Sequence, residues 1–245
     1  VNLNGALTVA ATAPTTITRP PSAPAKLPTN GQNNINSVHI DIQTGGTLTA
    51  SSTLTLTGTD TNGILFTRTG TATLTNSTVI MNPNASVILT SGTFVDTNAF
   101  NILQLTPTLS STGKTYTFGG TASTTGNFDI NPTAGSALAL TVNLGGDFTV
   151  AATATTTITR TTSATSVLDL RPASTDYNLT SGHIDIQTSG TLDATSAASV
   201  ITLTGTDTNG ILFTRTGTFT AGNSTVIMNP NATVNLTSGT FVDTN

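Results

Sequence analysis

A segment of 43 residues occurs twice in this chain, and this repetition constrains the fold more than any other feature. Leu56–Asn98 returns as Leu203–Asn245 with 38 identities at an offset of 147 residues. Shorter segments repeat at offsets of 141 and 144, namely Val1–Arg19 with Val142–Arg160 and Ser37–Thr44 with Ser181–Thr188. Repetition at a long period predicts a repeat architecture. We therefore expect one module at residues 1–141 and a second, incomplete module at 142–245, continuous with the first.

The few differences between the long copies indicate which side chains face the interior. Ala72 and Leu74 become Phe219 and Ala221, so a small–large pair is exchanged for a large–small pair two positions apart. Residues two apart in a strand lie on one face, and the exchange preserves total volume, as a packed interior requires. Ile88 becomes Asn while its apolar neighbours persist, which predicts that Ile88 faces water.

A shorter theme recurs inside each module, consisting of an alternating apolar–polar strand, a Gly corner, a second short strand and a third. Successive units begin at His39, Ile64 and Ser86 and continue at spacings of 22–29 residues. Gly, Asn and Pro at the corners, with Thr, Val and Ile between them, favour short strands over helices. The pattern predicts an all-β fold, a parallel β-helix (β-solenoid) of about ten coils with three short strands per coil, and about six coils per module.

Tandem β-sandwich domains of the immunoglobulin type are the alternative fold. Asn62-Gly63 and its repeat Asn209-Gly210 are dipeptides that favour tight hairpins between antiparallel strands. However, the polar loop at 58–63 is longer than a two-residue turn, and the chain lacks the Trp that such sandwiches usually bury. These observations favour the solenoid.

Residues 19–38 depart from the repeating pattern, because Pro is concentrated there. Proline cannot donate to a β-ladder, so we expect an extended excursion in the first module where the second has ordinary strand sequence. A surface loop is the main interpretation. A cap, or a contact with a neighbouring subunit, is the alternative.

The composition excludes several classes of protein. Only 7% of the residues are charged, against roughly 25% in an average soluble domain. The seven Lys and Arg residues and the net charge of −4 form no basic patch, so nucleic acid is not an expected partner. Cys is absent, which excludes disulfides and thiolate metal sites, and no apolar run is long enough to cross a membrane as a helix. A weakly charged chain rich in hydroxyl and amide groups suits an extracellular or cell-surface location.

Two copies of one polar loop are the candidates for a calcium site. Asp60 and Asn62, with their repeats Asp207 and Asn209, place carboxylate and amide oxygens in one tight turn. Calcium prefers such ligands, but two side chains fall short of a full coordination shell. An Asx turn explains the loops without an ion. They are therefore weak calcium candidates, and we expect no cofactor.

His39 and His183 each stand two residues before an Asp, at Asp41 and Asp185. Such a pair shares one face of a strand and could bind a metal or form a base–orienter dyad. Each module has only one His and no nucleophile signature nearby. We therefore interpret both as exposed strand pairs beside inward-facing Ile residues.

Catalysis is not expected, although some parallel β-helices cleave polysaccharides. That reaction needs clustered carboxylates near Arg or Lys. Here Asp129, Asp147, Asp169 and Asp176 are scattered along the sequence, so we expect no enzyme. Thr-x-Thr rows such as the one at 53–57 are also what ice-binding β-helices display, but the Thr-rich tracts fall on more than one expected face.

The strings HIDIQTGGTLTA at 39–50 and VNLGGDFTV at 142–150 surround a Gly corner with alternating apolar residues. In this respect the chain resembles the repeat regions of large bacterial surface proteins, the filamentous-haemagglutinin-like and autotransporter-type adhesins. The resemblance covers nearly the whole chain, although the long modules and the Pro-rich segment depart from it. It implies an extracellular stalk, fibre or adhesin without an active site.

Together these observations predict a structural extracellular protein that forms a filament, sheath or stalk by head-to-tail or lateral association. Neither end reads as a polar cap, and Val1, Leu3, Phe241 and Val242 are the expected assembly positions. The expected partner is the chain itself, as a homopolymer or as the continuation of a longer repeat chain, with surface glycans as a second candidate. An adhesin or an ice-binding solenoid is the alternative function, and a polysaccharide-acting enzyme is a third.

Overall fold

The computed structural model describes residues 7–8, 15–17, 25–29, 34–195, 198–230, 233 and 235–239, and the side chains of 15–16, 34–195, 198–230 and 233. The described residues form thirty short strands and two 3-10 turns, η1 (Asp96–Asn98) and η2 (Pro172–Ser174), without an α-helix. Their paired strands are all parallel. The predicted all-β parallel β-solenoid is confirmed, and the antiparallel sandwich is wrong.

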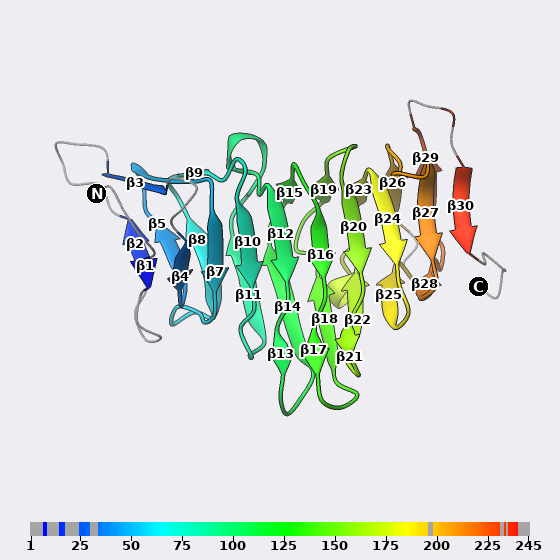
Figure 1. The fold of residues 1–245 in the computed structure, drawn as a ribbon, viewed down its shortest axis with the longest axis horizontal. Coiled ribbons are helices and arrows are strands. Elements are labelled where there is room, and N and C mark those ends of the chain that lie inside the picture. The colour runs from blue at the N-terminus through cyan, green and yellow to red at the C-terminus, as the bar shows by residue number, and fades with distance from the viewer. Residues whose placement is uncertain are drawn as a thin grey trace.

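The chain visits three faces in a fixed order, and each face is a stack of parallel strands (Figure 1). The first face is sheet A, whose ten strands in order are β1 (Leu7–Thr8), β4 (Ile35–Ser37), β7 (Thr53–Leu56), β10 (Thr78–Met81), β12 (Ile102–Leu105), β16 (Phe128–Ile130), β20 (Thr155–Ile158), β24 (His183–Ile186), β27 (Ile211–Arg215) and β30 (Asn235–Gly239). The second is sheet B, with β2 (Thr15–Ile17), β5 (Ile40–Ile42), β8 (Ile64–Arg68), β11 (Val87–Ser91), β14 (Lys114–Gly119), β18 (Ala139–Asn143), β22 (Thr165–Asp169), β25 (Gly190–Asp193) and β28 (Thr218–Thr220).

The third face is divided into two sheets. Sheet C holds β3 (Ala25–Thr29), β6 (Gly46–Ala50) and β9 (Thr71–Thr73), and sheet D holds β15 (Ala122–Thr124), β19 (Phe148–Val150), β23 (Leu179–Ser181), β26 (Val200–Leu203) and β29 (Thr225–Met228). Between them the chain passes through η1, where isolated bridges join Phe94 to Ala122 and Phe100 to Thr124. A small sheet E, with β13 (Thr108–Leu109), β17 (Thr133–Ala134) and β21 (Thr161–Thr162), extends the corner between sheets A and B over three coils.

The solenoid makes about eight turns from β4 to β30, slightly fewer than the ten coils predicted. Along sheet A the sequence separation of paired residues is smallest for Ile35 with Leu54 and largest for Ile184 with Phe213. Only the coil between β4 and β7 is shorter than the predicted spacing. With strands about 4.8 Å apart, eight turns give a rod of roughly 38 Å.

Inward-facing apolar residues stack from coil to coil to form one continuous core. Leu54, Val79 and Leu103 are in register on sheet A and are fully buried. Ala72 and Leu74 are also buried, which confirms that the positions of the volume exchange face one interior. Ile88 faces outward and is 37% exposed, as predicted from its replacement by Asn.

Identical sequences in the two modules lie on different faces of the solenoid. ILFTR forms β8 on sheet B and β27 on sheet A, and TVIM forms β10 on sheet A and β29 on sheet D. From β8 to β27 the chain makes five turns and then passes two of the three faces. The offset between the long copies is therefore five and two-thirds coils, where six were expected, and the second copy is turned by one face relative to the first.

The Pro-rich segment contains a strand, contrary to the expected surface loop. Within it Ala25–Thr29 forms β3, which pairs in parallel with β6 from Ala25↔Gly46 to Thr29↔Ala50. Pro28 is tolerated because β3 is the edge strand of sheet C and needs a ladder on one side only. The rest of residues 19–33 lies outside the described residues.

Candidate functional site

The two polar loops form Asx turns of the same geometry in both copies. Asp60 Oδ1 accepts hydrogen bonds from the backbone N–H groups of Asn62 and Ile64, each at 2.8 Å. Asp207 Oδ1 accepts the equivalent bonds from Asn209 and Ile211, also at 2.8 Å. One carboxylate oxygen in each loop is therefore occupied by the backbone. The structure supports the Asx interpretation, and calcium binding at these four residues stays a prediction.

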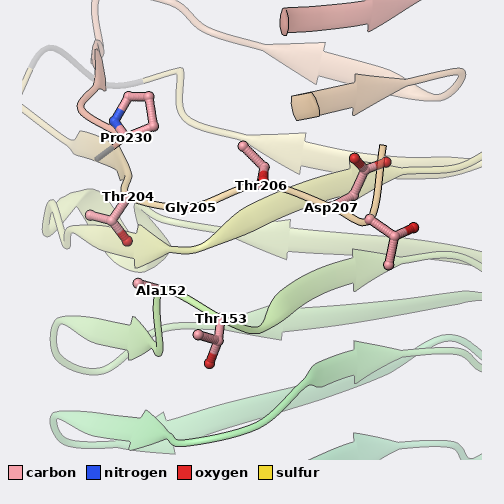
Figure 2. A pocket seen from close by; sticks show the side chains of 8 residues that line it. Ala152, Thr153, Thr204, Gly205, Thr206, Asp207 and Pro230 are labelled. Atoms are coloured by element: carbon pink, nitrogen blue, oxygen red, sulfur yellow. The ribbon is translucent and has the colours of Figure 1, made fainter. Parts of the chain in front are cut away.

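A shallow groove of about 380 Å³ lies beside the second loop (Figure 2). Three coils contribute its lining residues, which are Ala152, Thr153, Thr204, Gly205, Thr206, Asp207, Thr208 and Pro230. Burial opposes ionisation of Asp207, but the N–H groups of Ile211 and Asn209 outweigh it, so its pKa lies below the usual value. Hydroxyl groups and one carboxylate line this groove, without a cation or a nucleophile–base pair.

The two His residues are buried, so their predicted exposure is wrong. His39 is 8% exposed and His183 is 3% exposed. Each lies at a corner, where the alternation of inward and outward side chains breaks down. The Nδ1 atoms of both are buried without a hydrogen-bond partner among the described residues. Burial at a corner makes an accessible metal site or catalytic dyad a poor interpretation of these residues.

Buried hydroxyl groups form a hydrogen-bonded chain at the corner before the His residue in each module. Ser37 Oγ donates to the carbonyl of His39 at 2.7 Å and lies 3.0 Å from Thr15 Oγ1. In the second module, Ser181 Oγ donates to the carbonyl of His183 at 2.7 Å and lies 2.9 Å from a Thr hydroxyl, that of Thr156. The hydroxyls satisfy a backbone group inside the corner, which is a structural role.

Carboxylates do not gather into a catalytic or metal centre in the described part of the chain. Among its side chains, no three His, Asp or other ligating residues lie together. Burial raises the pKa of Asp129, against hydrogen bonds from Gln104 and Thr157. Asp169 lies opposite Asp193 on sheet B, and burial, with a smaller contribution from that neighbouring charge, raises the pKa of Asp169.

Outward Thr residues do not form one regular array. The central outward row of sheet A runs through Thr55, Ile80, Gln104, Asp129, Thr157 and Asp185. On sheet B one row holds Thr115, Thr141, Val167, Thr191 and Thr218 in register. Apolar and acidic residues therefore interrupt the Thr-x-Thr pattern on these two faces.

A second groove, of about 350 Å³, was not expected from any motif in the sequence. Its lining residues are Thr159, Arg160, Gln187, Thr188 and Thr216, with no carboxylate among them. They come from three coils at the corner between sheets A and B. Thr159 Oγ1 donates to Gln187 Oε1 at 2.7 Å, and Arg160 Nη1 donates to the carbonyl of Ala164 at 3.2 Å.

Every residue of this second groove has an identical counterpart in the first module. The counterparts are Thr18, Arg19, Gln43, Thr44 and Thr69. The offset to the first module is 141 residues for Thr159 and Arg160, 144 for Gln187 and Thr188, and 147 for Thr216. The five residue types are therefore the same in both modules although the spacing between them changes twice. That preserved set is the signal in the sequence that could have revealed the groove. Thr18 and Arg19 lie outside the described residues.

The predicted assembly positions Val1, Leu3, Phe241 and Val242 also lie outside the described residues. The last strands before them are described, however, and their inward side chains are incompletely covered. Phe219, Val226 and Met228 pack against the core but stay partly exposed, and Ile227 on the outer side is 43% exposed. Apolar surface is therefore available at this end of the described solenoid.

Compared with known proteins, the chain matches no family model, no curated protein and no solved structure. The fold alone defines its class, which is a β-solenoid repeat protein. The resemblance to haemagglutinin-like and autotransporter-type adhesins stays a prediction beyond that fold. No helix in the described ranges has the length and apolarity that crossing a bilayer requires.

Proposed function

We propose that this chain is a structural, extracellular repeat protein whose solenoid rods associate into a filament, sheath or stalk. The observation that carries the proposal is the incompletely covered core at the last described coils. Val226 and Met228 are partly exposed there, whereas their counterparts Val79 and Met81 are fully buried in the middle of the rod. A further coil, from a second copy or from the continuation of a longer chain, would bury these side chains and extend three parallel sheets, which is favourable for apolar surface.

The turn of one face between the modules also supports a mechanical role. A binding face needs the same outward residues at successive positions on one side of the rod. Here the near-identical segments lie on different faces, so their loops and grooves are distributed around the axis. Such a distribution suits a rod that is used for its length. It gives no support to an ice-binding face.

Electron microscopy and sedimentation of the purified chain over about 1–100 µM test the proposal. We expect elongated assemblies whose length grows with concentration. Val226→Lys places a charge on the inward side of the last strand of sheet D and should shorten them strongly. Thr225→Lys adds the same charge on the outward side of that strand and should leave the length nearly unchanged. Compact monomers at every concentration would overturn the proposal.

A further inference from the structure

Sheet B presents an outer face between two corners of different charge. From β14 to β28 its central outward residues are small and uncharged, and Val167 lies between Thr141 and Thr191 in one register row, whereas the outward residue of β5 is Asp41. Ile88 adds an exposed apolar side chain on the same sheet. A row of β-branched residues in register is suited to packing against a second sheet about 10 Å away.

The corner where the strands of sheet B begin carries the cationic groove. Arg160 lies in it, and its guanidinium reaches the carbonyl of Ala164, one residue before β22. Hydroxyl and amide groups complete the lining, without a carboxylate. The groove is therefore matched to an incoming anion, which could accept hydrogen bonds from the guanidinium and the hydroxyls together.

At β22 and β25 the corner where these strands end carries the opposite charge, because the cation nearby, Arg171, forms an ion pair with Asp176 at 3.5 Å. Asp169 ends β22 and Asp193 ends β25, and the two are paired in register. Like charges directly opposite each other in a sheet are destabilising. The raised pKa of Asp169 has burial as its main cause and this neighbour as a further one. A cation delivered to this corner would relieve the repulsion.

We propose that sheet B is a lateral interface between two parallel copies of this rod, related by a two-fold axis along the rod. That axis reverses the strand direction but keeps the coil level. It sets Val167 against the Val167 of the second copy. It also sets Asp169 of each copy against the start of β22 in the other copy. Within one chain, Asp169 and the start of β22 lie about 13 Å apart along the strand. Arg160 then meets Asp169 of the other copy, twice per dimer.

The area of this face is sufficient for a specific contact. Nine strands at about 4.8 Å spacing and five residues of width give roughly 650 Å² per copy, or about 1,300 Å² in total. That is within the range of about 1,200–2,000 Å² found for specific interfaces. This inference rests on the proposed function, since lateral association is one of its two modes, but it names the face, the symmetry and the charge pair.

Mixing two variants tests the interface. Arg160→Asp alone should place carboxylate against carboxylate, and Asp169→Arg alone should place guanidinium against guanidinium, so each should weaken lateral dimers at least tenfold. In an equimolar mixture both contacts become complementary, and dimers should return to near the wild-type level. Thr149→Asp, which adds a charge to sheet D, is the control and should leave them unchanged. Sedimentation at low salt and the cross-section from small-angle X-ray scattering measure the dimer.

The two proposals fail in different observables. A wild-type cross-section that stays that of one solenoid, or a mixture that does not recover, would overturn the sheet B interface. Axial assemblies whose length grows normally in that case would leave the proposed function standing. Loss of axial growth with an intact lateral dimer would contradict head-to-tail stacking and leave the interface supported.

Discussion

Two strands with the same sequence occupy different positions in this rod and have different degrees of burial. Thr78–Met81 forms β10 in the middle of sheet A, where its Val and Met are fully buried. Thr225–Met228 forms β29 at the edge of sheet D, where its Val and Met stay partly exposed. The strand sequence decides which side chains face inward. The coils on either side decide whether those side chains are covered.

Hydrogen bonds within a corner, by contrast, are the same in both copies. The Asx turns at Asp60 and Asp207 and the hydroxyl chains at Ser37 and Ser181 keep their partners although the copies lie on different faces. Local geometry is therefore set by local sequence. The face on which a segment lies is set by the number of strands before it, because a strand of alternating apolar and polar residues can form on any of the three faces.

Placing a charge at the paired Val positions should show the largest difference between the middle and the end. Val79→Lys buries an ammonium group in a fully apolar interior without a partner, which costs several kcal/mol and should abolish cooperative folding. In Val226→Lys the ammonium can reach water, so the chain should stay folded with a modest loss of Tm. Thermal melts followed by circular dichroism measure both variants. Equal losses would contradict the comparison.

Truncating the paired Met side chains should give a smaller difference in the same direction. Met81→Ala leaves a cavity in a closed core and should lower the free energy of unfolding by about 2–5 kcal/mol. Met228→Ala removes a partly exposed side chain and should cost less than half as much. Urea unfolding of both variants measures the difference. A larger loss at Met228 than at Met81 would show that the last coil is as closed as the middle.

Removing the corner hydroxyls should give equal effects in the two copies. Ser37→Ala and Ser181→Ala each remove the hydroxyl that donates to a corner carbonyl, at His39 and His183; the carbonyl of His39 keeps the backbone N–H of Thr15 at 3.0 Å. Each should cost about 0.5–1.5 kcal/mol, because each removes one hydrogen bond of a network that is local and identical. Urea unfolding measures both, and Ser→Thr at the same two positions, which keeps the hydroxyl, is the control. A difference of more than about 1 kcal/mol between the copies would mean that the corner depends on its face.

The periodic features of the fold were predictable from the sequence, because strands alternate with a period of two. Ala72, Leu74 and Ile88 were assigned to the correct side from that alternation and from the substitutions between copies. The turn of one face between modules was not predictable. It depends on how many short strands fit into one repeat period, and corners of variable length conceal that number.

The errors fall at corners and edges, where the alternation carries no information. The alternation of His183 with Ile184 predicts an exposed His, but His183 lies at a corner and is 3% exposed. The Pro-rich segment predicts a surface loop, but Pro28 lies in β3, an edge strand that needs donors on one side only. Arg160 was missed because its groove is assembled from separate coils that lie far apart in the sequence, which no short motif reveals.

Replacing Asp193 by the residue found at the equivalent position of the first copy should have the smallest effect on stability. Asp193 occupies the position of Thr49, and it lies opposite Asp169 on sheet B. Asp193→Thr and Asp193→Asn both remove one of two adjacent like charges and should raise the free energy of unfolding at pH 7, by less than about 1 kcal/mol. The Asn variant keeps an acceptor for the backbone N–H of Thr195, which Asp193 binds at 3.0 Å.

The pH dependence of this gain has a definite sign. Because the pKa of Asp169 is raised in the folded state, the folded protein takes up the proton before the unfolded chain does as the pH falls. The penalty from two ionised carboxylates is therefore fully present above the folded pKa and disappears below it. The stability gain of Asp193→Asn should accordingly be largest near neutral pH and vanish in acid. A gain that is constant with pH would show that the side chain at 193 acts through packing, without a contribution from charge.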